Sequence, residues 1–226
     1  LIERDAAAIW WYNRINRPEV DLTQLDNAYI QQMQDYYQSI GRSLHVLDIT
    51  TDIPVPCFVC VSYNQSTGKE ILYGFGCHLD ARMAVERAVI ELNQLLPIVL
   101  TPRPASFDAS MATWLDHETI QSHDYLSPLP NQSLRVDDCY PIQDKADVNL
   151  ALTQLVSCFQ SANIDLLMLD LTQADIGMPV VKMIAPGLRH FWRRLGAGRL
   201  YDVPVSMEWL PSPLSEAEVN PVSIVI

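Results

Sequence analysis

The chain has 226 residues, a formal net charge of −12 and 49% hydrophobic residues, which together describe a globular protein with a sizeable core. The acidic balance excludes general nucleic-acid binding, because that activity needs a positive face against the phosphates. No window reaches the ~18 uncharged apolar residues of a membrane helix, and no signal peptide is evident. Five cysteines, an odd number, are scattered through apolar segments, so we expect a protein of the reducing cytoplasm.

Two helices are predicted at the start of the chain. Apolar residues at helical spacing predict the first over Ile2–Ile15, and Pro18 ends the pattern. Glu3, in its first turn, suits the positive end of a helix dipole. The second helix is predicted over Leu25–Ile40, with Gly41 as its stop.

Three strand-like runs follow these helices. They are Leu44–Thr50, Cys57–Tyr63 and Ile71–Phe75. The turn Asn64–Lys69 joins the last two as a hairpin, with Gly68 supplying the turn geometry.

Cys57 and Cys60 form a CxxC pair inside the second of these runs. A redox pair or half of a zinc site is one interpretation. There is no second CxxC, however, and residues three apart face opposite sides of a strand. We therefore interpret both as core cysteines.

The run that follows the hairpin leads from two glycines into a helix. Gly74 and Gly76 end the strand, and the strand–glycine–helix order favours a phosphate-facing turn, because the N–H groups at a helix start are free donors. Asp80 is expected to cap the helix. His78 is interpreted as a side chain that bonds the loop backbone.

The helix after Asp80 carries a polar stripe of functional interest. Arg87, Glu91 and Gln94 lie at steps of four and three, so they align on one face, flanked by alanines. A base, an acid and an amide in this arrangement suit a metal-bound phosphate ligand. The alternative is an ordinary Arg87–Glu91 pair on a solvated face.

Residues 97–145 are rich in proline and lack strong periodicity. A segment of this kind inside a compact domain is typical of a lid or a substrate-side insertion. His117 and His123, with neighbouring acids, suggest a metal site, but their spacing matches no standard one. We interpret them as solvated loop residues.

The last third of the chain predicts a helix over Asp147–Ser161 and buried strands over Ile164–Leu171 and Pro179–Ile184. The predicted buried face of the helix consists of Val148, Leu152, Leu155, Val156 and Phe159. A helix between strands, with helices covering the sheet, predicts an α/β sandwich.

A basic spot follows these strands, with four arginines within Arg189–Arg199. One interpretation pairs them with the carboxylates of this acidic protein, which is worth little per pair. The other is contact with phosphate or peptide, because the guanidinium fork suits bidentate oxygens.

Three separated segments resemble, in the same order, the YcaO family of ATP-dependent peptide cyclodehydratases. Residues 1–13 resemble the end of its SxxExxER helix and the WW-containing continuation. Residues 74–94 resemble its GxGxHxD run and RAxxExxQ helix, and residues 178–205 resemble its C-terminal strand–turn segment. The match is closest to the members that make azoline rings in ribosomal peptides.

The resemblance implies a set of site residues for ATP and Mg²⁺. It makes Glu3 and Glu91 ligands of Mg²⁺ and gives Gln94 a part in orienting the nucleotide. Arg87 and Arg189 would face the phosphates. It also implies an α/β (α+β) fold, with sheets of mixed strands covered by helices.

The implied reaction cyclises Cys, Ser or Thr of a precursor peptide to a thiazoline or oxazoline, as in bacteriocin maturation. The implied partners are a precursor peptide with its leader and a leader-binding domain or protein. Nucleic acid and membranes are not expected as partners, and a homodimer is left open. Two alternatives also stay open: another chemistry of the family, such as thioamide formation, and a non-catalytic chain that docks a peptide.

The resemblance also predicts the domain organisation. Residues 1–226 are expected to be the C-terminal part of a single ATP-binding domain whose N-terminal part is absent, so the chain alone is not expected to turn over ATP. Azoline-forming members end in a proline-rich tail that reaches the active site. The tail here, residues 211–226, has only Pro221 in that place, which leaves open the tail's catalytic role near Pro221.

Overall fold

The computed structural model describes residues 1–140 and 147–225. Residues 141–146, which include the end of the segment predicted to be irregular, and Ile226 of the tail lie outside the described residues. The body is built on a mixed five-stranded sheet in the order β4-β3-β2-β1-β5. Its strands are β1 (Glu19–Val20), β2 (His45–Asp48), β3 (Cys57–Ser62), β4 (Leu72–Cys77) and β5 (Ser133–Leu134). Neighbouring strands are antiparallel, except that β1 and β5 are parallel. Strand β4 lies at one edge of the sheet and β5 at the other.

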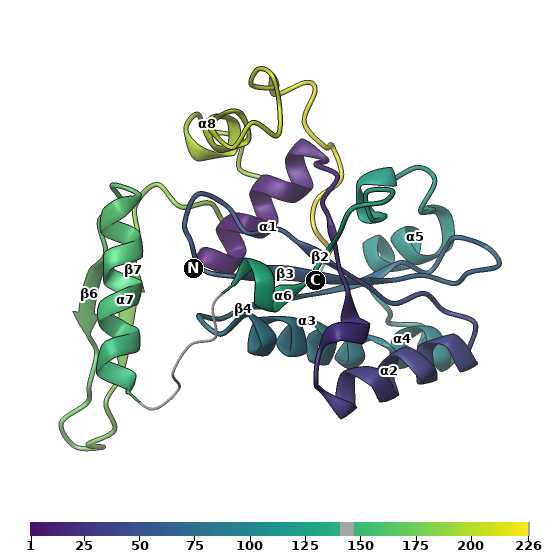
Figure 1. Cartoon of the computed structure of the whole chain (residues 1–226), viewed down its shortest axis with the longest axis horizontal. Coiled ribbons are helices and arrows are strands. Elements are labelled where there is room, and N and C mark those ends of the chain that lie inside the picture. Colours follow the sequence, from purple (N-terminus) through teal and green to yellow (C-terminus); the bar gives the residue numbers. More distant parts are fainter. Residues whose placement is uncertain (141–146, 226) are drawn as a thin grey trace.

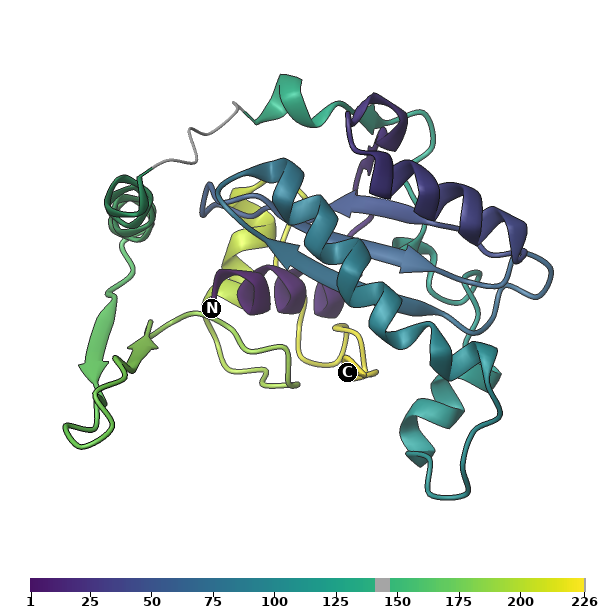
Figure 2. The same cartoon turned by 90° about the horizontal axis from the view of Figure 1, so that it is seen from below.

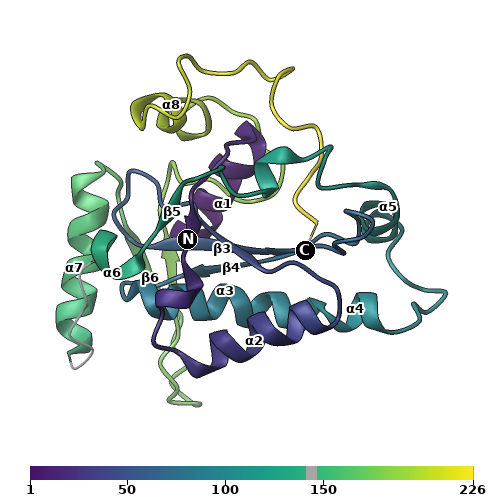
Figure 3. The same ribbon diagram turned by 45° about the vertical axis from the view of Figure 1, so that its right-hand side comes forward.

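Helices cover both faces of this sheet, as the sequence predicts for an α/β sandwich. Helices α1 (Ile2–Asn13) and α8 (Arg199–Ser206) lie on one face, and α2 (Ala28–Ser39) and α3 (Ala81–Leu95) lie on the other (Figures 1 and 3). The remaining helices are α4 (Pro97–Leu100), α5 (Ala109–His117), α6 (Val136–Cys139), α7 (Val148–Ser161) and the 3-10 turns η1 (Leu22–Gln24) and η2 (Asp124–Leu126). Within the described parts of the chain, no helix is both long and apolar enough to cross a membrane.

Capping side chains fix where the helices begin. Asp80 accepts hydrogen bonds from the backbone N–H groups of Arg82 and Met83, as predicted. Helix α2 begins later than predicted, because Asn27 caps it and the preceding residues form the separate turn η1. Gly41 follows the helix with φ +70°, the left-handed conformation expected of a glycine stop.

The two glycines predicted to form a phosphate-facing turn are instead part of strand β4. A Cβ atom on Gly74 would lie 2.3 Å from the Leu92 nitrogen, and one on Gly76 would lie 2.0 Å from the Ala84 carbonyl oxygen. The glycines therefore let β4 and α3 pack backbone against backbone. The alanines of α3, which seemed to leave room for a ligand, are buried in this contact.

The structure overturns the predicted burial of the last third of the chain. Strands β6 (Leu167–Asp170) and β7 (Val181–Ile184) form a separate antiparallel pair, and their side chains are mostly exposed. Of the predicted buried face of α7, Phe159 is buried, but Val148 and Leu152 are 80% and 56% exposed. This helix and hairpin stand to one side of the body (Figures 1 and 2). Apolar runs predict burial but do not specify what covers them.

The segment after α3 contains short elements joined by loops. Helices α4 and α5 lead to η2, and β5 pairs in parallel with β1 at the edge of the sheet opposite β4. Part of this segment therefore belongs to the body. Its role as a lid or insertion stays a prediction.

The core confirms the interpretation of the CxxC pair. Cys57 and Cys60 are free and fully buried in β3, and burial raises the pKa of the Cys60 thiol. Trp10 and Trp11 are also fully buried, in an aromatic cluster between α1 and β4. Most of the exposed large apolar side chains among the described residues lie around α7, β6 and β7 rather than at these tryptophans.

Candidate active site at the edge of strand β4

The candidate site lies along the free edge of β4, between α1 and α3. Side chains of this strand alternate between the two helices: Phe75 contacts Trp10 of α1, with ring centroids 6.3 Å apart, whereas Gly74 and Gly76 face α3. Residues of β4 also alternate in the direction of their backbone groups. The N–H of Phe75 donates away from β3 to a side chain at the edge.

That side chain is Glu91 of α3. Its carboxylate accepts from the Phe75 N–H at 2.5 Å. The pKa of Glu91 is raised, chiefly by burial and further by the negative charge of Glu3, while the Phe75 hydrogen bond lowers it. Glu3 and Glu91, 88 residues apart in sequence, are therefore close enough in the structure for their charges to repel each other. The alternative Arg87–Glu91 ion pair is not formed between these two described residues.

Two carboxylates from different helices whose charges repel each other suit a hard metal ion. Within residues 1–140 and 147–225, no group of three or more His, Cys, Asp or Glu is arranged to hold a metal. A protein site for Mg²⁺ commonly supplies only one or two carboxylates, and waters and phosphate oxygens complete the shell. Glu3 and Glu91 fit that requirement, because a divalent cation relieves the repulsion between them.

The other two members of the predicted stripe are available for a ligand. Arg87 and Gln94 are exposed on α3, on the same side as Glu91, and neither bonds to any other described residue. A guanidinium and an amide on either side of a carboxylate provide donors for phosphate and nucleotide.

Arg189 is placed against α1 rather than over the stripe. Its backbone N–H donates to the Asp5 carboxylate at 2.7 Å, and its guanidinium donates to the Ala197 carbonyl. The Nε atom of Arg189 is buried without a partner among the described residues. The structure shows no contact between Arg189 and the α3 stripe, so its phosphate-facing role stays a prediction.

A buried ion-pair network, which sequence reasoning missed, holds this segment in place. Asp5 is fully buried on α1, and Arg199 donates to both of its oxygens at 2.6 to 3.2 Å. Arg199 also forms a two-pronged pair with Asp52 at 2.7 and 2.8 Å. For Arg199, therefore, the interpretation as a paired cation is correct. The one sequence feature that could have indicated this network is Asp5 itself, an acid next to the alanines of α1.

The tail packs onto α1 and β4 beside the candidate site. The Trp11 indole donates to the Val222 carbonyl at 2.7 Å. The Tyr73 hydroxyl of β4 donates to the Val225 carbonyl at 2.8 Å and accepts from its N–H at 2.7 Å. Pro221 is exposed between these anchored residues. Val225 is therefore bonded to the side chain of a strand residue two positions from Phe75.

The remaining candidate residues have structural partners. His78 accepts from the Asp80 N–H at 2.9 Å, as predicted for a loop-bonding side chain. The interpretation of His123 as a solvated residue is wrong. Its ring is buried against Trp114 and pairs with Glu118 at 2.7 Å. His117 is exposed.

Two solved heterocyclases are similar to this chain in sequence and fold. A heterocyclase solved in complex with substrate and cofactor is 41% identical, with a TM-score of 0.91 over 99% of this chain and 30% of that one. The heterocyclase TruD is 40% identical, with a TM-score of 0.88 over 100% of this chain and 31% of its own.

An uncharacterized protein of Methanothermobacter thermautotrophicus is 27% identical over 84% of this chain and 51% of its own length. The chain thus spans about half of this curated relative and less than a third of the two heterocyclases. Residues 1–189 match the family model described as the ATP- and Mg²⁺-binding YcaO cyclodehydratase. Because this match covers most of the sequence, the chain belongs to the YcaO family.

Proposed function

We propose that this protein carries out the ATP- and Mg²⁺-dependent cyclodehydration of Cys, Ser or Thr in a ribosomally made precursor peptide. The observation that supports this most is the pair of carboxylates, Glu3 and Glu91, at the β4 edge beside Arg87 and Gln94, which have no bonding partner among the described residues. Family membership and the identity to two heterocyclases support the reaction class. The products would be thiazoline or oxazoline rings.

In this proposal the residues of the chain position and neutralise charge rather than form covalent bonds. Glu3 and Glu91 hold Mg²⁺, Arg87 and Arg189 neutralise phosphate oxygens, and Gln94 orients the nucleotide. ATP, when bound, supplies the phosphoryl group that turns the former amide oxygen into a leaving group. Charge neutralisation and alignment are the main contributions a protein makes to phosphoryl transfer.

We also propose partners and a location for the protein. A leader-bearing precursor peptide is the substrate, and a leader-binding domain or separate protein presents it. The tail around Pro221 contributes to the reaction in this proposal, which is supported by the hydrogen bonds between Val225 and Tyr73 of β4. The cytoplasm, where ATP and reduced cysteine are abundant, is the location we propose.

The direct test is turnover of a precursor peptide encoded beside the gene, with its leader intact. The full-length protein, ATP and Mg²⁺ should remove one water per ring, seen by mass spectrometry, with one phosphate released for each. Glu91→Gln should abolish both signals while circular dichroism stays unchanged. The control is Glu86→Gln on the same helix, whose side chain bonds Asn27 outside the stripe.

Other outcomes identify the alternatives. Exchange of an amide oxygen for sulfur would show thioamide formation. Peptide binding without mass change or phosphate release would show a docking chain. Normal ring formation by Glu91→Gln would contradict its assignment as a metal ligand.

A further inference from the structure

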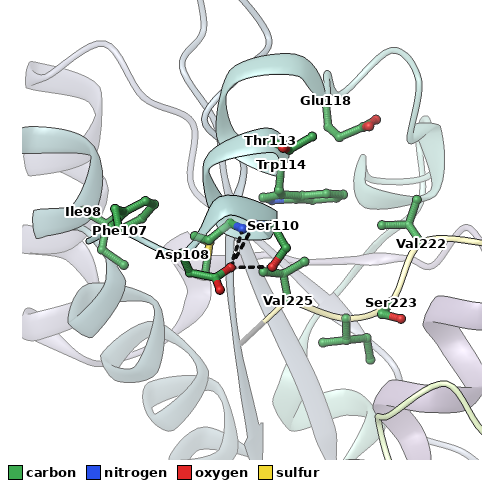
Figure 4. Close-up of a pocket in the computed structure, with 12 residues that line it drawn as sticks. Ile98, Phe107, Asp108, Ser110, Thr113, Trp114, Glu118, Val222, Ser223 and Val225 are labelled. Atoms are coloured by element: carbon green, nitrogen blue, oxygen red, sulfur yellow. Dashed lines mark hydrogen bonds between the residues drawn. The ribbon is translucent and has the colours of Figure 1, made fainter. Parts of the chain in front are cut away.

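A cavity of about 670 Å³ lies between α5 and the C-terminal tail (Figure 4). Its walls are mostly apolar and include Ile98, Phe107, Met111, Trp114, Val222 and Val225. The acids at its rim are already bonded within the protein. Asp108 caps α5 by accepting from the N–H groups of Ser110 and Met111, and Glu118 pairs with His123. The cavity therefore favours an apolar group over a charged one.

The cavity continues the polar stripe of α3. Glu91, Gln94 and Ile98 follow one another at steps of three and four, so they lie along one side of the helical segment. Helix α4 follows α3 with only Leu96 between them, and Leu96 itself is helical, with φ −55° and ψ −39°. At ~1.5 Å of rise per residue, Ile98 on the cavity wall lies roughly 10 Å along the helix from Glu91.

Strand β4 also runs from the cavity to Glu91. The Trp114 indole, in the cavity wall, donates to the Ile71 carbonyl at 2.8 Å and contacts the Tyr73 ring, with centroids 6.0 Å apart. Tyr73 holds Val225 of the opposite wall. Phe75, two residues further on, holds Glu91, and two strand residues span ~7 Å. The helical segment α3–α4 and strand β4 thus both place the cavity beside the carboxylate pair.

We propose that this cavity binds an apolar side chain of the precursor peptide, close in sequence to the residue that forms the ring. The inference rests on the proposed function and adds a substrate-recognition site to it. An extended peptide rises ~3.3 Å per residue, so the ~10 Å between the cavity and Glu91 corresponds to about three residues. Residues 222–225 of the tail form a wall of the cavity and are therefore not its occupant.

The test measures peptide binding without ATP, by calorimetry on the full-length protein. The probes are short glycine peptides with a single Cys, in which one Leu is moved position by position around the Cys. At the matching position the Leu peptide should bind about tenfold more tightly than the all-glycine peptide, because one apolar side chain leaves water. Equal affinity for Leu and glycine peptides at every position would overturn the proposal.

Variants locate the binding to the cavity. Met111→Trp on α5 and Val222→Trp on the tail each fill it, and each should remove the preference for Leu. Ala109→Trp, on the same helix but outside the wall, should keep it. Phe107→Ala enlarges the cavity and should shift the preference from Leu to Phe, a change that loss of structure would not cause. Circular dichroism and thermal melting establish that each variant is folded.

Two results separate this proposal from the proposed function. If wild type prefers the Leu peptide and Met111→Trp does not, the cavity stands even when no ring forms from the full precursor. If rings form but the filled variants bind peptides as Ala109→Trp does, the cavity assignment fails and the cyclodehydration proposal remains.

Discussion

At the scale of single residues, Glu91 meets two opposing demands. Its carboxylate accepts a hydrogen bond from the edge of β4, and it also faces the charge of Glu3. Burial raises the pKa of Glu91 above its ordinary value, so Glu91 holds its proton more strongly in the folded protein without metal than in the unfolded chain. Its contribution to stability is therefore fully present below the unfolded pKa and is lost as pH rises through the folded pKa.

Glu91→Gln should stabilise the metal-free protein at neutral pH by about 0.5–2 kcal/mol, since it keeps an acceptor for Phe75 and removes the repulsion from Glu3. Glu91→Ala should instead destabilise it by about 1–3 kcal/mol, because the Phe75 N–H loses its partner. Urea unfolding at pH 7 measures both. Equal destabilisation by both substitutions would contradict this account, because it would show that the negative charge of Glu91 does not destabilise the metal-free protein.

Binding of Mg²⁺ together with a non-hydrolysable ATP analogue should weaken as the pH falls through the raised pKa of Glu91. Metal ligation needs the carboxylate, and a higher pKa places its protonation closer to neutrality. The rise in melting temperature caused by the ligands, followed across pH 4 to 8, reports this. Glu86→Gln should follow the wild-type curve, whereas Glu91→Gln should show little rise at any pH.

At the scale of elements, the contact between β4 and α3 determines where the stripe lies. Gly76→Ala would place a Cβ 2.0 Å from the Ala84 carbonyl oxygen, which is backbone and cannot rotate away. We expect a loss of about 3 kcal/mol of stability and impaired nucleotide binding, because α3 must shift with Glu91. Gly196→Ala is the control, since its nearest neighbour would be 3.8 Å away. Similar unfolding curves for the two variants would contradict this account.

The hairpin β6–β7 and α7 carry most of the exposed large apolar side chains among the described residues. Met168 and Ile176 are 67% and 69% exposed there, and exposed apolar patches of this kind mark contact surfaces. We expect the 226-residue chain to self-associate, and Met168→Glu with Ile176→Glu to reduce the association seen by sedimentation velocity. Gln32→Glu with Gln38→Glu adds the same charge on exposed positions of α2 and should leave association unchanged.

At the scale of the whole molecule, local patterns predicted much of the fold. Helical spacing located α1, α2, α3 and α7, with the Asp80 cap marking the start of α3, and strand-like apolar runs located β2 to β4. Strands β1 and β5, of two residues each, are too short to leave a pattern. The exposure of β6 and β7 was missed, because an apolar run carries no information on what lies beside it.

The candidate site likewise contains residues that the sequence could predict and residues that it could not. Glu91 and its stripe could be predicted, since one helix fixes their relative positions. The proximity of Glu3 depends on how α1 and α3 flank β4, and it was predicted only through the family resemblance. Asp5 was missed because an acid in a first helical turn usually serves the dipole, whereas here it anchors Arg199 and the Arg189 backbone.

Removing residues 219–226 should cost about 3–6 kcal/mol of stability. The buried side chains of Val219 and Ile224 are lost, and the apolar surface that they cover becomes exposed to water. The truncation also removes the acceptor of the Trp11 indole. The free energy of unfolding in urea measures the loss. Pro221→Ala, at an exposed position of the same tail, should change it little.

The bond between Trp11 and Val222 joins residues 211 positions apart, so it also constrains how the protein folds during synthesis. A ribosome adds ~5–20 residues per second, which means that α1 waits more than ten seconds for the segment that completes its burial. During that time the aromatic face of the helix has to be shielded by β4 together with Trp114 and Tyr125, or by a chaperone. Nascent chains stalled before residue 219 should therefore be more sensitive to protease at α1 than chains released after it.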